Sequence, residues 1–137
     1  MRTHPGEERL LEAFETCSLP PEEFGHAEHL QVGWEVLAIE PLSEALTRFS
    51  RALRRFAAAA GGPDKYHETI TWFYLLLLNE RRGLLAHDHD WETFRDHNSD
   101  LFGSSRELLS RYYSADRLSS DRARREFLLP DLLPCAA

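Results

Sequence analysis

Three histidines in two short segments are the residues of this chain best suited to chemistry. His26 and His29 stand in FGHAEHL, and His67 stands in KYHETIT. Both segments lie where a helix should begin, and the spacing directs the three side chains along apolar stripes rather than toward water. Neutral imidazole is the commonest protein ligand for zinc, iron, copper and nickel. Three inward imidazoles beside a glutamate therefore predict a metal site or an acid–base pocket.

The spacing of His26 and His29 allows them to share a ligand. Residues three apart on a helix lie about 5–6 Å apart at their Cβ atoms, so the two rings can converge on one ion. Gly33, one turn further along, leaves room on the same face for another helix or a ligand. The pair alone also fits a structural interpretation, in which both rings bond to backbone or carboxylate groups at a helix start.

His67 and Glu68 add a third imidazole and a carboxylate. His67 should lie in the first turn of the most apolar helix of the chain, with Thr71 and Tyr74 on its face. The helix dipole favours a carboxylate at a helix start. A buried carboxylate still needs a partner, which a metal ion, a protonated histidine or an arginine would supply.

If the two helices are adjacent, these residues predict one histidine-rich pocket. The predicted metal ligands are three imidazoles and one carboxylate, namely His26, His29, His67 and Glu68. Glu68 would be a fourth ligand, an orienting group or a general base. The predicted catalytic residues and substrate contacts are Glu68, Tyr66 and Tyr74, with Thr71 as a further contact.

Three neutral nitrogens with a carboxylate suit oxygen chemistry or metal-activated water at a divalent iron, copper or zinc ion. The chain is therefore interpreted as a metal-dependent enzyme acting on a small molecule. Two alternatives stay open. One is a catalytic or ligand-binding pocket without a metal. The other is a structural network of His, Glu, Thr and Tyr in a non-catalytic ligand-binding or protein-interaction module.

Other polar groups favour plainer interpretations. The run HDHD at 87–90 favours a solvated loop in which Asp90 caps the next helix, and His97 near a helix end is a weaker candidate for a site. Four arginines between Arg48 and Arg55 could grip a phosphate, but the acidic chain favours a solvated face paired with carboxylates. Phosphate loops, nucleophile elbows and C-x-x-C pairs are absent from the sequence.

Helical periodicity dominates the chain, and strand alternation is poor. Helices are expected over about 7–16 and 25–39, and from Pro41 to the Gly61-Gly62 pair, which suits a left-handed helix end. A fourth is expected from 65 to about 78 or 82, capped by Asp64 and apolar all round, which is typical of a central helix.

The last third of the chain reads as shorter pieces. Helices are expected over about 90–97, 104–112 and 119–127, with Ser104 and Ser119 as caps for the last two. The tail LLPDLLP is too rich in proline for a helix and should lie as an extended apolar strap over the body of the protein. The fold class is therefore all-α: one helical bundle of four main helices, shorter C-terminal helices and a proline-containing tail, with about 1–5 and 133–137 frayed.

Composition and charge restrict the number of domains, the partners and the cellular setting that we expect. A chain of 137 residues with 42% hydrophobic residues should form a single domain. A net charge of −7 argues against nucleic acid or a membrane surface as partner. Two distant cysteines, Cys17 and Cys135, and a polar N-terminal segment predict a reducing, cytoplasmic setting of bacterial type. A homodimer is one way to cover the all-round apolar helix.

With these residues in view, the chain resembles a family of small bacterial proteins of uncharacterised function. The resemblance is carried by FGHAEHLQVGW, KYHETITWF and RYYSADRLSSDRARREFLLPDLLP, and it covers most of the chain from Phe24 onward. It implies a shared helical fold and no activity. Its motif positions include those of the predicted site, His26, His29, Tyr66, His67 and Glu68.

Overall fold

The computed structural model describes residues 5–84 and 90–132, and for 5–9 only the backbone. The described part is helical and contains no strand, which confirms the all-α prediction. Its α-helices are α1 (Pro5–Glu15), α2 (His26–Ile39), α3 (Leu42–Ala59), α4 (Glu68–Gly83), α5 (Trp91–His97), α6 (Ser105–Ser110), α7 (Ala115–Leu118) and α8 (Asp121–Arg125). Three 3-10 turns connect them: η1 (Pro21–Glu23), η2 (Pro63–Lys65) and η3 (Ser99–Phe102).

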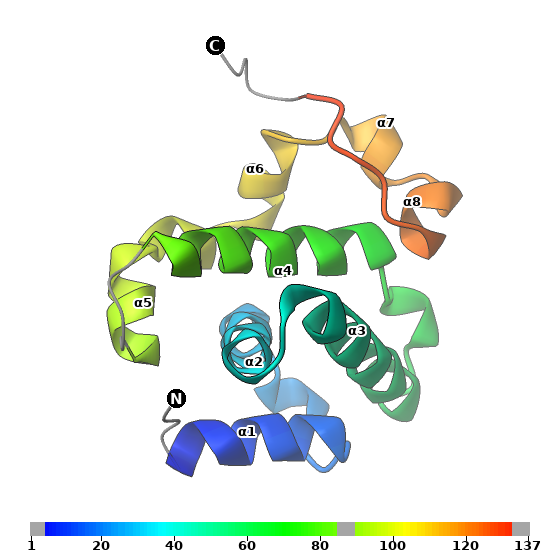
Figure 1. Ribbon diagram of the computed structural model, residues 1–137. Coiled ribbons are helices and arrows are strands. Elements are labelled where there is room, and N and C mark those ends of the chain that lie inside the picture. The colour runs from blue at the N-terminus through cyan, green and yellow to red at the C-terminus, as the bar shows by residue number, and fades with distance from the viewer. Residues whose placement is uncertain (1–4, 85–89, 133–137) are drawn as a thin grey trace.

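Helix α4 is the central element, as its apolar sequence predicts. It crosses the middle of Figure 1, with α1, α2 and α3 on one side and α6, α7 and α8 on the other. It packs directly against α2, α3 and α8. Gly33 permits a close approach of α2 to α4, because a Cβ atom there would lie 3.0 Å from a methyl carbon of Leu75 and of Leu78. Within the described ranges, no helix is long and apolar enough to cross a membrane.

Aromatic rings fill the core between α1, α2 and α3. Phe14 is fully buried, and its ring centroid lies 4.7 Å from that of Phe24, 5.7 Å from Phe49 and 5.4 Å from Phe56. Burying rings of this size contributes a large share of the hydrophobic stabilisation of a small domain. Phe24, Phe49 and Phe56 also form one wall of the pocket described below.

The helix ends confirm some predicted caps and correct others. Asp90 and Ser104 cap α5 and α6 by accepting hydrogen bonds from Thr93 and Glu107 backbone N–H groups. Pro41 precedes α3 as its N-cap residue rather than opening it, and Gly61 follows its end with a φ of +81°. That left-handed conformation is favourable for glycine.

Two predicted caps are wrong. Asp64 lies inside η2, since Pro63 starts a 3-10 turn there, and α4 begins at Glu68 with His67 as its cap. Ser119 follows the end of α7 as its C-cap residue, and Ser120 caps α8 instead by accepting a hydrogen bond from the Ala123 N–H.

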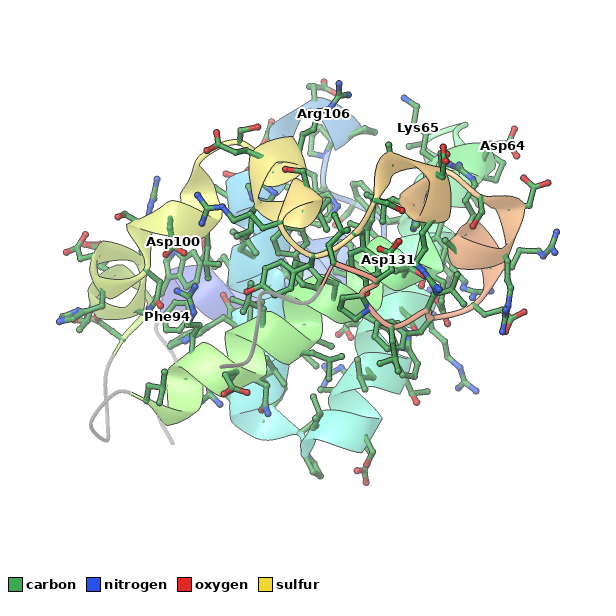
Figure 2. The ribbon with its side chains drawn as sticks, turned by 90° about the horizontal axis from the view of Figure 1, so that it is seen from above. Asp64, Lys65, Phe94, Asp100, Arg106 and Asp131 are labelled. Atoms are coloured by element: carbon green, nitrogen blue, oxygen red, sulfur yellow. The ribbon has the colours of Figure 1, made fainter. Side chains whose placement is uncertain are left out.

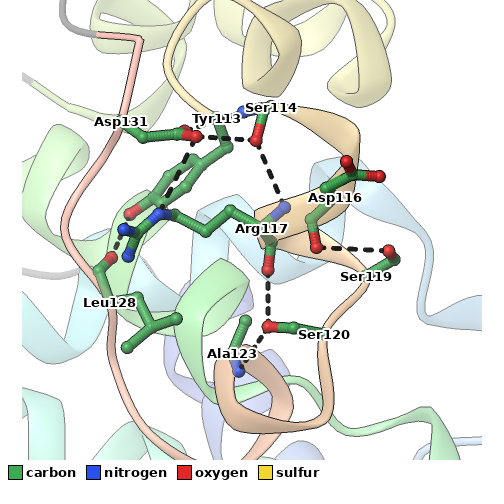
Figure 3. A network of polar contacts seen from close by, with 9 residues as sticks. All are labelled: Tyr113, Ser114, Asp116, Arg117, Ser119, Ser120, Ala123, Leu128 and Asp131. Carbon is green, nitrogen blue, oxygen red and sulfur yellow. Dashed lines mark hydrogen bonds and ion pairs between the residues drawn. The ribbon is translucent and has the colours of Figure 1, made fainter.

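Residues 126–132 form an extended strap against α4 and α7, as predicted for the tail LLPDLLP, whose residues 133 and 134 lie outside the described part of the chain. Leu128 is pinned from two sides: its N–H donates to Thr69 Oγ1 (3.1 Å), and its carbonyl accepts from the Tyr113 hydroxyl (2.7 Å). Figure 3 shows the second anchor, where Asp131 accepts from the Ser114 backbone N–H and hydroxyl. The strap is therefore fixed by hydrogen bonds along its length.

Candidate functional site

A cavity of about 550 Å³ opens between α2, α3 and α4, and all three predicted histidines line it. Its walls are largely apolar: Phe24, Leu30, Phe49, Leu53, Phe56, Ala57, Ala60, Ile70, Leu75 and Leu78. The polar lining consists of His26, His29, Lys65, Tyr66, His67, Thr71, Tyr74 and Ser105. The cavity is of the size and character that small-molecule sites have in proteins.

His26 opens α2 and holds one defined tautomer. Its Nε2 lies 2.8 Å from the carbonyl oxygen of Leu101, and a carbonyl can only accept, so Nε2 carries the proton. Its ring meets Tyr74 edge-on at a centroid distance of 5.3 Å. The other nitrogen, Nδ1, has no hydrogen-bond partner among the described residues. His26 is therefore anchored at one nitrogen and unpaired at the other.

His29 repeats this arrangement with the nitrogens exchanged. Its Nδ1 donates to the Gly25 carbonyl (2.9 Å), and Nε2 is left without a partner in the described part of the chain. The ring packs on Phe24 at a centroid distance of 4.0 Å. Burial lowers the pKa of His29, and the hydrogen bond to the Gly25 carbonyl offsets only part of that shift. At neutral pH His29 therefore presents a neutral imidazole with a free lone pair.

His67 differs because both of its ring nitrogens are occupied by backbone. Its Nδ1 accepts from the Ile70 N–H (3.2 Å) and its Nε2 donates to the Leu118 carbonyl (2.8 Å). Burial lowers the pKa of His67, so it remains neutral in this role. The residue caps α4 and ties it to α7. His67 lines the cavity, but neither of its ring nitrogens is free to bind a ligand.

Glu68 has the arginine partner that was one of its expected options. Arg54 on α3 donates to Glu68 Oε1 at 3.1 Å and lies 4.7 Å above the Tyr66 ring. The Tyr66 hydroxyl also donates to Glu68 Oε1. Glu68 is not among the residues that line the cavity. Its carboxylate holds Tyr66 and Arg54 in place beside the cavity.

The two predicted tyrosines line the cavity as hydrogen-bond donors. Burial, followed by the bond to Glu68, raises the pKa of Tyr66 to about 12, and burial raises that of Tyr74 to about 12. Both hydroxyls therefore stay protonated at neutral pH. Tyr74 donates to the Ser105 carbonyl (3.3 Å), and the Thr71 hydroxyl donates to the His67 carbonyl (2.8 Å).

The predicted three-histidine metal centre is not assembled by this arrangement. In the described residues, no group of three or more His, Cys, Asp or Glu side chains is placed to hold a metal ion. The geometry gives the reason, since His67 is engaged at both nitrogens and Glu68 is held by Arg54. Of the four predicted ligands, which all lie in the described ranges, only His26 and His29 keep a nitrogen free. Metal binding by this chain stays a prediction.

Sequence reasoning missed the walls of the cavity. Phe49, Leu53 and Phe56 belong to the apolar stripe of α3, and a stripe gives no sign of whether it fills a core or faces a cavity. Two polar residues were missed as well: Lys65 is the last residue of η2, and Ser105 is the first residue of α6. Figure 2 places Lys65 at the edge of the molecule, beside Asp64. The signal available was that Lys65 is the first residue of the KYHETIT segment.

The remaining polar candidates lie away from the cavity. Arg48 donates to Glu15 at 2.6 and 2.9 Å and to Glu40 at 3.1 Å, which confirms the carboxylate-paired interpretation of that arginine. His97 is exposed and donates to the Thr93 carbonyl. His87 and His89 lie outside the described residues.

Helix α2 also buries a carboxylate. Glu35 is 1% exposed and accepts a hydrogen bond from Gln31 at 3.3 Å. The reason is that α2 packs against α1 as well as against α3 and α4, so its polar face is covered too.

Comparisons with known proteins return no matching family model, no matching curated protein and no matching solved structure. The family resemblance therefore rests on the three sequence motifs alone and stays a prediction. Arguments about function depend on the cavity and its side chains.

Proposed function

We propose that this protein binds a small, mostly apolar molecule in the cavity between α2, α3 and α4. The observation that carries the proposal is a cavity of about 550 Å³ with apolar walls and two imidazoles that each keep one nitrogen unpaired. Small-molecule sites combine a mainly apolar lining with a few fixed polar groups that orient the ligand.

The anchoring of the two imidazoles supports a binding role. The Leu101 and Gly25 carbonyls each hold one ring in one tautomer, so the free nitrogens of His26 and His29 are oriented before a ligand arrives. Such preorganisation reduces the entropy lost on binding. The same two nitrogens could accept a proton from a bound molecule, which would extend binding to acid–base catalysis.

Filling the cavity without touching the histidines tests the proposal. Ala57 lines the cavity from α3, whereas Ala58 beside it is exposed and does not. The neutral fluorescent probe N-phenyl-1-naphthylamine should bind the natural protein at one saturable site. Binding should be lost in Ala57→Trp and kept in the matched control Ala58→Trp. Unchanged binding in a folded Ala57→Trp variant would contradict the proposal.

A metal-dependent enzyme is the second candidate, and the two unpaired nitrogens favour it. His26 Nδ1 and His29 Nε2 would supply two ligands and leave positions for water or substrate, as catalytic sites require. His67 would have to give up a backbone bond to join them.

Elemental analysis of protein purified without a histidine tag separates the two candidates. The metal proposal expects about one equivalent of iron, copper or zinc. That metal should be lost in the folded double variant His26→Ala/His29→Ala and retained in His67→Ala. Protein free of metal after aerobic and anaerobic preparation, or metal unchanged in the double variant, would contradict it.

A further inference from the structure

The charge pattern of the cavity lining is unusual for an acidic protein. The chain carries a net charge of −7, yet none of the described residues that line the cavity is an aspartate or glutamate. Lys65 is the one permanently charged residue among them, and it is exposed at the edge of the molecule (Figure 2). The interior of the cavity therefore presents no formal charge when its histidines are neutral.

Within this neutral interior, the unused ring nitrogens are hydrogen-bond acceptors. Backbone carbonyls cannot donate, so they fix the protons of His26 on Nε2 and of His29 on Nδ1. The free nitrogens, His26 Nδ1 and His29 Nε2, then carry lone pairs. The hydroxyl protons of Tyr66, Tyr74 and Thr71 are already donated to Glu68, Ser105 and His67.

We infer that the ligand class is a neutral aromatic alcohol, that is, a planar apolar molecule whose hydroxyl donates to the free nitrogen of His29 or His26. This inference rests on the proposed small-molecule pocket and specifies its ligand. A phenolic O–H is a strong donor, and imidazole nitrogen is its strongest neutral acceptor among side chains. Phe24, Phe49, Phe56 and the two tyrosines offer ring faces and edges to an aromatic body.

Other head groups fit less well. A carboxylate would meet two lone pairs of the same sign as its own charge, and the permanent cation of the lining, Lys65, lies exposed at the edge of the molecule rather than beside the imidazoles. An ammonium group would find no carboxylate on the described lining to offset its desolvation. An ether or hydrocarbon would leave both nitrogens unpaired.

Three naphthalenes that differ only in the head group test the inference. The titration compares 2-naphthol, 2-methoxynaphthalene and 2-naphthoate at neutral pH by calorimetry or intrinsic probe fluorescence. The dissociation constant for 2-naphthol should be about tenfold lower than for the methyl ether, which is the value of one net hydrogen bond. 2-Naphthoate should bind most weakly.

The variant His29→Leu assigns the preference to the imidazole. It should bring the affinities of 2-naphthol and 2-methoxynaphthalene within about twofold of each other, because one donor–acceptor bond is gone. Retained binding of the methyl ether shows that the variant is folded. The exposed His97→Gln variant serves as the matched control and should keep the full preference. If His29→Leu does not fold, His26→Leu gives the same comparison for the other nitrogen.

The outcomes separate this inference from the proposed function. Equal binding of 2-naphthol and its methyl ether, or tightest binding of 2-naphthoate, overturns the inference while the pocket stands. A preference for 2-naphthol that survives both His29→Leu and His26→Leu also overturns it. Failure of all three compounds to bind, together with failure of N-phenyl-1-naphthylamine, overturns the pocket itself.

Discussion

The two sides of α4 treat their polar groups in opposite ways. On the side of the strap, Thr69 is fully buried, and its hydroxyl donates to the Glu126 carbonyl (2.7 Å) while accepting from the Leu128 N–H (3.1 Å). On the side of the cavity, His26 and His29 each use one ring nitrogen and leave the other unpaired. One side is closed by hydrogen bonds, and the other keeps acceptors free.

This difference teaches how to separate structural from functional polar residues in a chain without matching relatives. Buried polar groups that serve stability are satisfied, because an unsatisfied one costs about 1–3 kcal/mol. His67 follows that rule at both nitrogens although it borders the cavity. The free nitrogens of His26 and His29 carry no such cost, because neither is a buried atom, and both stay open to a ligand. The predictions that follow test this division, from the largest effect to the smallest.

Thr69→Val should have the largest effect on stability. The change keeps the shape of the side chain but leaves the Glu126 carbonyl and the Leu128 N–H without their partner. We expect the free energy of unfolding to fall by about 2–4 kcal/mol in urea denaturation. The exposed Thr47→Val on α3 is the control and should change it by less than about 0.5 kcal/mol. Equal effects of the two variants would show that the strap does not depend on Thr69.

Gly33→Ala should come next, because it overpacks the contact between α2 and α4. The new methyl group would lie 3.0 Å from Leu75 and Leu78, which also form the floor of the cavity. Loss of about 1–3 kcal/mol of unfolding free energy is expected, with weaker binding of N-phenyl-1-naphthylamine. Gly83→Ala meets no atom within 4 Å and should be neutral. A Gly33→Ala variant with unchanged unfolding free energy and unchanged probe affinity would contradict the close approach of α2 to α4.

Tyr113→Phe should cost about 1–2 kcal/mol of unfolding free energy, because the buried Leu128 carbonyl loses its donor. The neighbouring Tyr112→Phe removes a hydroxyl that has no hydrogen bond among the described residues, so it should cost less. Neither variant should change probe affinity, since neither residue lines the cavity. A drop in probe affinity for Tyr113→Phe would contradict the division, because it would show that the strap side of α4 affects binding on the cavity side.

The pH dependence of stability should be the smallest effect. The pKa values of His29 and His67 are lowered in the folded protein from the ordinary value of 6.5. As pH falls below that value, the unfolded chain takes up protons that the folded chain resists, so the free energy of unfolding decreases. His29→Gln should flatten the curve as pH falls below the ordinary histidine value of 6.5, whereas carboxylates such as Glu15 and Asp100, whose pKa values are lowered by Arg48 and Arg81, act at lower pH. An unchanged curve would mean that His29 is protonated alike in both states.

Local periodicity was sufficient to predict most of the fold. Helix α2 was expected over 25–39 and spans His26–Ile39, and the all-round apolar character of α4 predicted its central place. The start of α4 could not be predicted in the same way. Asp64 is a common cap type, but the cap is His67, an imidazole acting through Nδ1.

The sequence predicted which histidines lie at the site, but not which of their ring nitrogens are hydrogen-bonded. Spacing brought His26 and His29 onto one face, and the structure places both on the same cavity. The partners that decide their roles are distant in sequence: His26 bonds to Leu101, 75 residues away, and His67 to Leu118, 51 residues away. No pattern within a helix carries that information, so sequence alone could not separate the capping histidine from the two with free nitrogens.

The protonation and accessibility of the imidazole nitrogens test the central claim most directly. Long-range ¹H–¹⁵N spectra of ¹⁵N-histidine protein, assigned with single His→Gln variants, report each nitrogen separately. The account predicts protons on His26 Nε2, His29 Nδ1 and His67 Nε2. Addition of 2-naphthol should shift the free nitrogens of His26 and His29 and leave both nitrogens of His67 in place. Saturable binding that moves His67 and leaves His26 and His29 unchanged would contradict the account.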